Sequence, residues 1–492
     1  METSTAAPSA APRLRRTLTL WDLVLYGIIV IQPVAPMSVF GVLSDAGHGH
    51  VVTTLLIAMV AMLFTAFSYG RMARAYPSAG SAFTYVGQEI NPALGYVTGW
   101  SMTMDYMLNP MICIIWCSQQ AFVFAPQLPY WLWAIFFGGI FTFLNIQGIK
   151  TSARVNTVLA AGMGAVVAVF FMVAVRYIFG HPHDGASFFS RPFYDPQLFN
   201  SKAVLAATSI AVLSYIGFDG ISTLSEEAEN PRRNILLATV LTCFVIGILS
   251  ALEVYAAQLV WPANQPFPNS DTAFTYVAGR AWKPMFAILG FTLLVANFGS
   301  GMGAQIGAAR LLYGMGRSKA LPQSFFGVVD PKRHVPRNNV IFVGVVALAG
   351  ALLVSFGLFS YGLGAEMLNF GALIAFMGVN MAAFVRYHVR EGGHNAIAPL
   401  VLTAVVIGLV LLPGSNWILL GCAALGLAVI AVWTPPLAGF TICFFLWKNL
   451  SWKAWIVGGI WMVVGIAVGA WKTRGFRGDL VNFELPPEEQ ES

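Results

Sequence analysis

Very few acidic residues interrupt the long apolar stretches of this sequence. They are Asp105, Asp219, Glu253 and, near the end of a stretch, Glu366. A carboxylate inside a lipid bilayer is costly, so each such residue is a candidate for a functional site. The chemistry it offers is the binding of a cation, either an ammonium group or a proton. The rest of the sequence must show whether these stretches span a membrane and what would bring the carboxylates together.

The sequence around each carboxylate leaves more than one role open. Asp219 lies in SYIGFDG, residues 214–220, where it either binds a substrate ammonium or a proton or caps a broken helix. Asp105 is either a second such site or a hydrogen-bond partner for loose backbone in the first apolar segment. Glu253 lies near the end of its segment, which is typical of gating or coupling, or of simple solvent exposure.

The composition indicates an all-α polytopic membrane protein. Of the 492 residues, 57% are hydrophobic and only 10% are charged, whereas about a quarter of a soluble domain is charged. Segments near the 20 residues that span a bilayer recur along the chain. They lie near 19–43, 50–70, 92–122, 128–147, 155–179, 202–225, 235–258, 284–314, 339–358, 361–387, 397–412, 417–434, 436–449 and 453–471. The segment 436–449 is short, so we expect 12 to 14 transmembrane helices.

The distribution of basic residues predicts that both termini are cytoplasmic. With the N-terminus inside, only 7 of the 27 Lys and Arg residues fall on the outer side, which favours this orientation and an even number of spans. Those seven are Arg176, Arg191, Lys202, Arg280, Lys283, Lys448 and Lys453. Residues 1–17 have no apolar core, so we expect a disordered cytoplasmic tail rather than a signal peptide. Residues 472–492 are expected to form a second cytoplasmic tail.

Two of the predicted helices carry breaks near their middle. The first is interrupted at Ile31-Gln32-Pro33, with Pro36 close behind, and the sixth is interrupted at residues 214–220. Because the two segments are five spans apart, they run in opposite directions. Paired breaks of this kind are typical of transporters built from inverted repeats, with the substrate bound at the breaks.

Four stretches resemble the amino acid–polyamine–organocation superfamily, and within it the bacterial putrescine importers. They are YPSAGSAFTYVGQEINPALGYVTGW (76–100), GFDGISTLSEEAENPRRNI (217–235), ARLLYGMGRSKALPQSFFGVVDPKRHVPRNN (309–339) and LNFGALIAF (368–376). The Ile31-Gln32-Pro33 step and the Asp105-Tyr106 pair carry the resemblance to the putrescine importers. The resemblance implies a LeuT-type 5+5 inverted-repeat core over 18–390, with repeats at about 18–180 and 200–390 and additional helices over 391–471. It also implies uptake or exchange of amino acids or amines across the plasma membrane, coupled to an ion or a proton.

The first break favours an amine over an amino acid as the substrate. Most amino acid transporters of the superfamily have a glycine–small–glycine step there, whose bare amides bind the substrate carboxylate. This chain has Ile31-Gln32-Pro33 instead, and Pro33 has no N–H to donate. A diamine has no carboxylate, and two acidic residues could hold its two ammonium groups, or one could carry a proton. Tyr106, Tyr215 and Phe218 are candidates for cation–π contact with the amine, or pack against neighbouring helices. The site is thus predicted at Ile31, Gln32, Pro33, Asp105, Tyr106, Tyr215, Gly217, Phe218 and Asp219.

The sequence leaves the coupling ion open and predicts no cofactor. Some relatives place a Lys in the fifth helix, where this chain has Met163. Protons through Asp219, sodium, or exchange therefore remain possible, and Ser300 in the eighth helix offers an oxygen. The five cysteines have no further metal ligands nearby, which predicts buried thiols and no metal site. No hydrolase, zinc-protease or nucleotide-binding motif is present, so neither an enzyme nor a nucleic-acid-binding protein is expected. The oligomeric state is not predicted.

Overall fold

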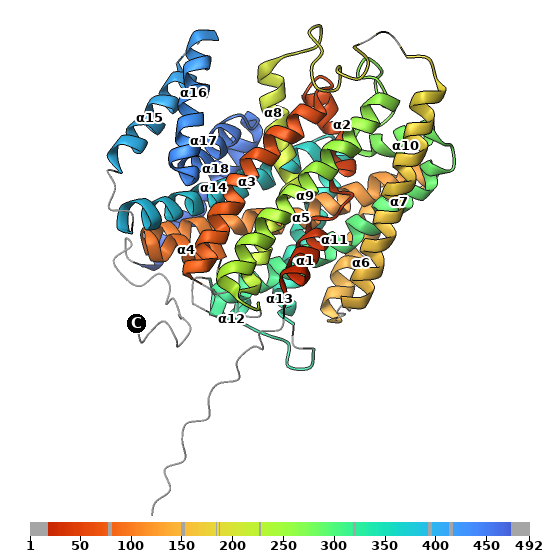
Figure 1. The fold of residues 1–492 in the computed structure, drawn as a ribbon. Helices are drawn as coiled ribbons and strands as arrows, with labels where there is room; N and C mark the ends of the chain where they lie inside the picture. Colours follow the sequence, from red (N-terminus) through yellow and green to blue (C-terminus); the bar gives the residue numbers. More distant parts are fainter. Residues whose placement is uncertain are drawn as a thin grey trace, which may run out of the picture.

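The structure of the protein is a computed structural model that describes residues 18–76, 81–148, 153–183, 185, 187–225, 228–317, 321–333, 335–391, 396–412 and 417–473. Its helices form one bundle (Figure 1). The first seven are α1 (Leu20–Ile31), α2 (Ala35–Ala46), α3 (Val51–Ala75), α4 (Ser81–Glu89), α5 (Pro92–Phe124), α6 (Tyr130–Ile146) and α7 (Ala153–Gly180). The next are α8 (Ser201–Ala211), the 3-10 turns η1 (Val212–Tyr215) and η2 (Phe218–Leu224), α9 (Pro231–Val260), η3 (Ser270–Thr272), α10 (Ala273–Ala281), α11 (Met285–Arg317), α12 (Gln323–Phe326) and α13 (Arg337–Leu353). The last are η4 (Val354–Phe356), α14 (Tyr361–Phe384), the π-helical η5 (Val385–Arg390), α15 (Ile397–Leu411), α16 (Trp417–Trp433), α17 (Pro435–Lys448) and α18 (Trp452–Lys472).

These helices confirm the predicted polytopic all-α architecture. Every predicted segment coincides with a helix or a broken helix, and the ends differ by only a few residues. In the described part of the chain, nine helices are long and apolar enough to cross a membrane, and the bent pair α1–α2 makes a tenth. Helices α6, α15 and most of α16 are shorter apolar helices. The predicted tail 1–17 and nearly all of the tail 472–492 lie outside the described residues.

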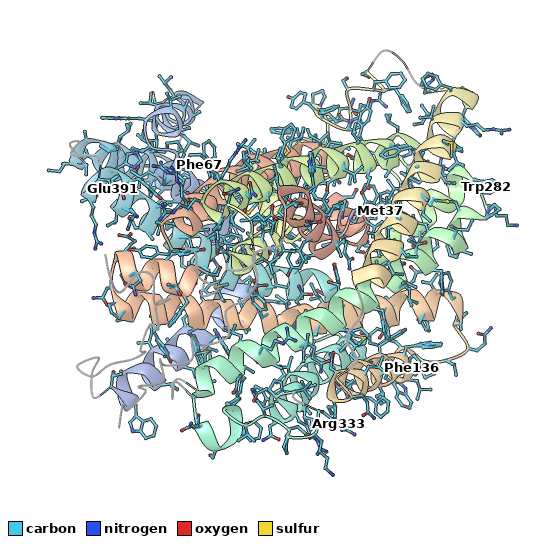
Figure 2. All side chains as sticks on the ribbon, turned by 60° about the horizontal axis from the view of Figure 1, so that its bottom comes forward. Met37, Phe67, Phe136, Trp282, Arg333 and Glu391 are labelled. Carbon is cyan, nitrogen blue, oxygen red and sulfur yellow. The ribbon has the colours of Figure 1, made fainter. Side chains whose placement is uncertain are left out.

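Large apolar side chains cover the outside of the bundle, as expected for a surface that faces lipid. Figure 2 shows Phe136 on α6 and Trp282 after α10 at the surface, and their side chains are 52% and 46% exposed. Met37 on α2, by contrast, is only 1% exposed and lies inside the bundle. Of the cysteines, Cys422 is exposed, so the prediction that all five thiols are buried was wrong for this one.

The first broken helix changes direction by 45° between α1 and α2. Helix α1 begins at a capping box, in which Thr19 and Asp22 bond to each other's backbone N–H groups. It ends at Ile31, because Gln32 adopts a φ of 70° and Pro33 follows with no N–H to continue the ladder. Pro36 lies in the first turn of α2, where a missing N–H costs nothing. The two prolines therefore end one helix and begin the next.

The second broken helix is the sixth in order, as predicted. Helix α8 tightens into η1, and the chain then turns at Gly217, whose φ is 124°. Side chains rarely adopt this conformation, so glycine is required there. The chain continues as η2, which carries Asp219 in its first turn. We call the end of the bundle where α1 begins the N-terminal face and the end where α2 finishes the opposite face.

The last four helices flank the core on the side of α14. Helices α17 and α18 pack directly against α14, while α15 and α16 pack on each other and on α17. Figure 1 shows α15 and α16 at the edge of the bundle. The division into two repeats and additional helices over 391–471 stays a prediction.

A buried ion cluster joins α4 to the end of α14 at the N-terminal face. The Glu89 side chain is fully buried, and its Oε1 lies 2.8 Å from Nη1 of Arg386 and accepts a 2.7 Å hydrogen bond from the Tyr76 hydroxyl. Its Oε2 lies 3.0 Å from Nη1 of Arg390, and the Arg390 guanidinium also donates to the Glu89 carbonyl at 2.9 Å. Burial, helped by the hydrogen bond to Glu89, raises the pKa of the Tyr76 phenol to about 12. The cluster thus fixes the α3–α4 connection against α14.

Replacing Glu89 with Gln should destabilise the protein by about 1–3 kcal/mol, because both guanidinium groups lose a charged hydrogen-bond partner. Thermal unfolding in detergent measures the loss. Glu391→Gln is the matched control, since Glu391 pairs with the same Arg386 at 3.0 Å but is 48% exposed. An exposed pair contributes about 0–1 kcal/mol, so the control should unfold close to the parent temperature. Equal losses in the two variants would contradict the assignment.

Candidate functional site

The two breaks predicted from the sequence lie against each other. A Cβ atom built on Gly217 would lie 3.0 Å from Cγ1 of Val30 and 3.2 Å from Cγ1 of Ile31. One turn further down, a Cβ on Gly27 would lie 2.6 Å from Cδ1 of Ile221. The backbone of η2 therefore runs in direct contact with the last two turns of α1. Ile31 and Gly217, two predicted site residues, are brought together.

Two buried carboxylates lie at this junction. Asp219 on η2 and Asp105 on α5 are each 4% exposed and close enough for their charges to act on each other. Oδ1 of Asp219 accepts a 3.1 Å hydrogen bond from the N–H of Gly217, whereas Asp105 has no hydrogen-bond partner among the described residues. No Lys, Arg or His of the described chain acts on either carboxylate. The junction is therefore a buried acidic site without a counter-ion.

Tyrosine side chains surround the two carboxylates. Tyr106, a predicted site residue, interacts electrostatically with Asp219 and Asp105 and packs near Gly307 of α11. Tyr69 of α3 also interacts with both acids, is fully buried, and has a hydroxyl with no hydrogen-bond partner among the described residues. The sequence did not indicate a role for Tyr69. It lies in an apolar segment, where a ring that lines a site cannot be distinguished from one that faces lipid or packs against another helix.

The other two predicted aromatic residues serve mainly in packing. The Tyr215 hydroxyl donates a 2.8 Å hydrogen bond to the carbonyl of Leu55 on α3, and the ring is fully buried. Phe218 is also fully buried, with its ring 5.7 Å from that of Tyr69 and 5.4 Å from that of Phe376. Phe218 thus packs against the Tyr69 ring. Tyr215 joins η1, in the broken sixth helix, to α3 by its hydrogen bond.

The first break is tied to α11 by side-chain hydrogen bonds. Nε2 of Gln32 donates to the carbonyl of Ala296 at 2.7 Å, and Nδ2 of Asn297 donates to the Ser38 hydroxyl at 2.9 Å. The backbone N–H of Gln32 is used by the carbonyl of Ile28 at 3.0 Å. With Pro33 next in the chain, this stretch presents few free donors to an anion.

Ser300 and Glu253, the further candidates for coupling or gating, lie outside this junction. The Ser300 hydroxyl hydrogen-bonds the thiol of Cys113 on α5. Glu253 on α9 is fully buried, so the reading of simple solvent exposure was wrong. The helix α9 continues for two more turns beyond Glu253 and is covered by neighbouring elements there, which the apolar pattern alone did not show.

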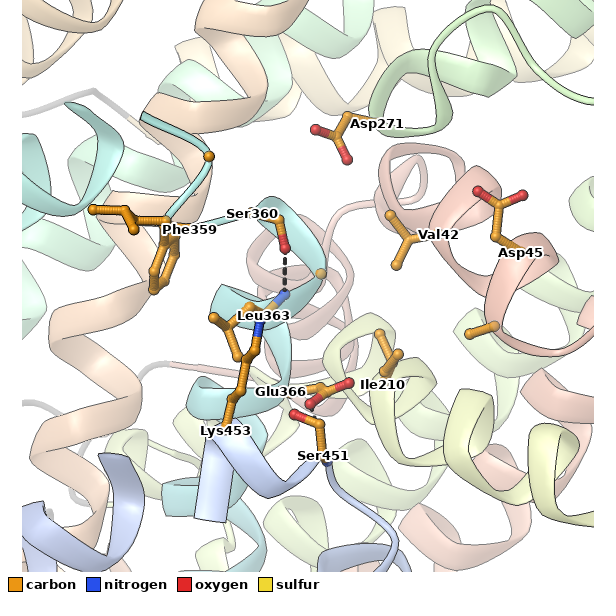
Figure 3. Close-up of a pocket in the computed structure, with 14 residues that line it drawn as sticks. Val42, Asp45, Ile210, Asp271, Phe359, Ser360, Leu363, Glu366, Ser451 and Lys453 are labelled. Carbon is orange, nitrogen blue, oxygen red and sulfur yellow. Dashed lines mark hydrogen bonds between the residues drawn. The ribbon is translucent and has the colours of Figure 1, made fainter. Parts of the chain in front are cut away.

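A cavity of about 410 Å³ opens at the opposite face (Figure 3). It lies between the end of α2, η3 and the start of α14, and its lining includes the carboxylates of Asp45, Asp271 and Glu366 and one basic residue, Lys453. Burial, helped by the neighbouring Asp45 carboxylate, raises the pKa of Asp271 to about 6. The sequence predicted only Glu366 among these acids. Asp45 and Asp271 lie outside the apolar segments predicted from the sequence, where acidic residues are common and do not indicate a site.

The chain is similar to known permeases over nearly its whole length. The family model described as amino acid permease matches residues 34–478. The chain is 33% identical over 475 residues to the low-affinity putrescine importer PlaP of Escherichia coli (strain K12), covering 96% of each chain. It is 26% identical to the branched-chain amino acid permease BcaP of Bacillus subtilis (strain 168), and the match covers 94% of each chain. It is also 26% identical to the methylthioribose transporter of the same organism, and that match covers 77% of this chain and 83% of the relative. The relatives are transporters rather than enzymes, and the chain belongs to the amino acid permease family of multi-pass membrane proteins.

Proposed function

We propose that this permease carries small amines, with diamines as preferred substrates, and that Asp219 and Asp105 bind their ammonium groups. The observation that carries the proposal is the pair of buried carboxylates at the junction of the two breaks, on which no basic side chain of the described residues acts. Two like charges this deep are costly unless a cation joins them. A diamine brings two positive charges and matches the charge of the pair.

The surroundings of the carboxylates support a cation further. Tyr69 and Tyr106 are close enough to both acids to interact with them electrostatically, and tyrosine is a residue type that suits an ammonium group. The first break, with the amide of Gln32 already bonded and no N–H on Pro33, is a weak cradle for a carboxylate. The similarity to a putrescine importer points the same way.

The alternative is an amino acid substrate. The branched-chain amino acid permease of Bacillus subtilis is among the relatives. In that case the substrate's amine would bind Asp219, and its carboxylate would need donors other than Pro33. The substrate competition below separates the two functions.

We further propose that the N-terminal face is cytoplasmic and that the protein lies in the plasma membrane, the inner membrane of a bacterium. The excess of Lys and Arg on that side supports the orientation. The acidic cavity of Figure 3 then opens to the outside, where its carboxylates would attract a cationic substrate before the break is reached. The Ser300 hydroxyl interacts with the Cys113 thiol and keeps an oxygen that can accept a cation, so a part of Ser300 in ion coupling stays a prediction.

In proteoliposomes, uptake of labelled putrescine should be abolished by excess unlabelled diamines and left unchanged by excess neutral amino acids. The reason is that only a second cation can replace the first between the two carboxylates. Liposomes without protein provide the control. If neutral amino acids abolish uptake and diamines do not, the substrate is an amino acid and the amine proposal is wrong.

Asp219→Asn should reduce the apparent affinity for putrescine by at least about 30-fold, equivalent to about 2 kcal/mol for a lost buried charge contact. The measurement is the KM of uptake at constant protein. An Asn oxygen can still accept the hydrogen bond from Gly217, so the variant keeps the helix cap and removes only the charge. Unchanged transport would show that Asp219 is a cap alone. Asp195→Asn is the matched control, because the half-buried Asp195 lies in the loop between α7 and α8 and also accepts a backbone hydrogen bond, from Gln197 at 2.9 Å.

Lowering the external pH from 7.5 to 5 should raise the KM for putrescine in right-side-out vesicles. Asp271 has a pKa of about 6, so it is charged above that pH and attracts the cation, and it is neutral below it. Asp271→Asn should have the higher KM throughout and should lose the change near pH 6. A KM that follows only the internal pH would indicate that the cavity faces the cytoplasm.

A further inference from the structure

Glu253 is a buried carboxylate that the substrate site leaves unused. Its side chain is fully buried in the outer half of α9, and neither carboxylate oxygen has a hydrogen-bond partner among the described residues. Ser250 lies three residues earlier, which places it on the same side of the helix. Its hydroxyl is also fully buried and also has no hydrogen-bond partner in that part of the chain. Three oxygen atoms on one stripe of α9 thus have no partner.

The helical period places this stripe toward the broken helix. Thr242, eleven residues before Glu253, donates a 3.4 Å hydrogen bond to the carbonyl of Val24 on α1. Eleven residues are three turns, so Glu253 lies on the same face as Thr242 and about 16 Å further along α9. At that height α9 is past the end of α1 and packs against α2 and α10. The carboxylate therefore faces the elements that continue beyond the first break.

The antiparallel neighbour α3 leaves no partner for the carboxylate. Three contacts define how α3 and α9 are paired. Gly70 packs against Leu236, and Gly247 packs against Met59. The side-chain amide of Gln258 donates a hydrogen bond to the carbonyl of Gly49. This pairing puts Thr53 and Thr54 at the height of Glu253. Both hydroxyls are used elsewhere, since they donate to the carbonyls of Phe193 and His50 at 2.6 and 2.7 Å.

No charged group compensates Glu253 either. The elements that pack against α9 carry several titratable side chains, and none of them forms a salt bridge or a hydrogen bond with Glu253 in the described part of the chain. These side chains are Asp22 and Tyr26 on α1, Asp45 on α2, His50, Tyr69, Arg71 and Arg74 on or next to α3, Arg176 and Tyr177 on α7, Tyr215 on η1, Asp219 on η2, and Tyr276 and Arg280 on α10.

We propose that Glu253 and Ser250 form a proton-binding site that couples transport to the proton gradient. An ionised carboxylate enclosed in this way would be far costlier than a neutral one. The carboxyl group can therefore exchange its proton only when α9 and the broken helix separate and water reaches the stripe. Proton release is then linked to the movement of the helix whose break forms the substrate site.

The proton-site proposal rests on the proposed function only for the choice of substrate. Two transport assays distinguish a failure of the proton site from a failure of the substrate proposal. Counterflow of labelled putrescine between equal pH values reports substrate binding and movement alone. Accumulation driven by an imposed pH gradient reports coupling. If the wild-type protein shows no counterflow, the substrate proposal fails, and the two assays are repeated with whichever amino acid the competition experiment identifies.

Glu253→Gln should keep counterflow and lose accumulation driven by the pH gradient, because the amide has the shape of the neutral acid but cannot release a proton. Ser250→Ala should keep counterflow and weaken the gradient-driven accumulation. Glu229→Gln, an exposed residue before α9, is the control and should keep both. Infrared spectra should show the carbonyl band of a protonated carboxyl group in the wild type that is missing from Glu253→Gln.

Three outcomes would overturn the proposal. One is gradient-driven accumulation by Glu253→Gln at the wild-type level. Another is accumulation that responds to a sodium gradient and not to a pH gradient in the wild type. The third is loss of counterflow in both Glu253→Gln and Ser250→Ala, which would show that this stripe of α9 serves the fold or the substrate path rather than coupling.

Discussion

The architecture depends on one constraint, which is that a helix broken inside a bilayer must have its freed polar groups satisfied by the protein itself. At the first break, the side chain of Gln32 bonds to the carbonyl of Ala296 and its backbone N–H bonds to that of Ile28. At the second, the carboxylate of Asp219 receives the N–H of Gly217. Both breaks are thus held by residues at their own centre, and the helices around them can pack as regular elements.

This arrangement makes the two roles predicted for Asp219, capping the broken helix and binding a cation, compatible with each other. A carboxylate has two oxygens and about four acceptor positions, so the backbone N–H groups of Gly217, Asp219 and Gly220 that act on Asp219 do not use its whole capacity, and a cation can still bind. The residue that caps the broken helix can therefore also bind the substrate. The first break is short, with only three residues between α1 and α2.

Much of the fold and part of the site could be predicted from the sequence. The breaks were visible because prolines and glycines inside an apolar segment have few other uses, and Asp105 and Asp219 stood out because acids are rare there. The sequence could not predict which way the side chains of Tyr215 and Phe218 point, or that Tyr69 lies near the acids. An aromatic residue in an apolar segment looks the same in the sequence whether its ring faces a site, another helix or lipid. The burial of Glu253 was missed because it depends on elements far away in the chain.

The pairing of α3 with α9 has a mechanical consequence. Contacts at both ends and in the middle of the pair, at Gly70, Gly247 and Gly49, keep one constant offset between the two helices along their whole length. A slide by one residue would break all three contacts at once. The two helices should therefore move as one stiff rod, and a tilt at the end near the α3–α4 connection would reappear as a displacement at the other end.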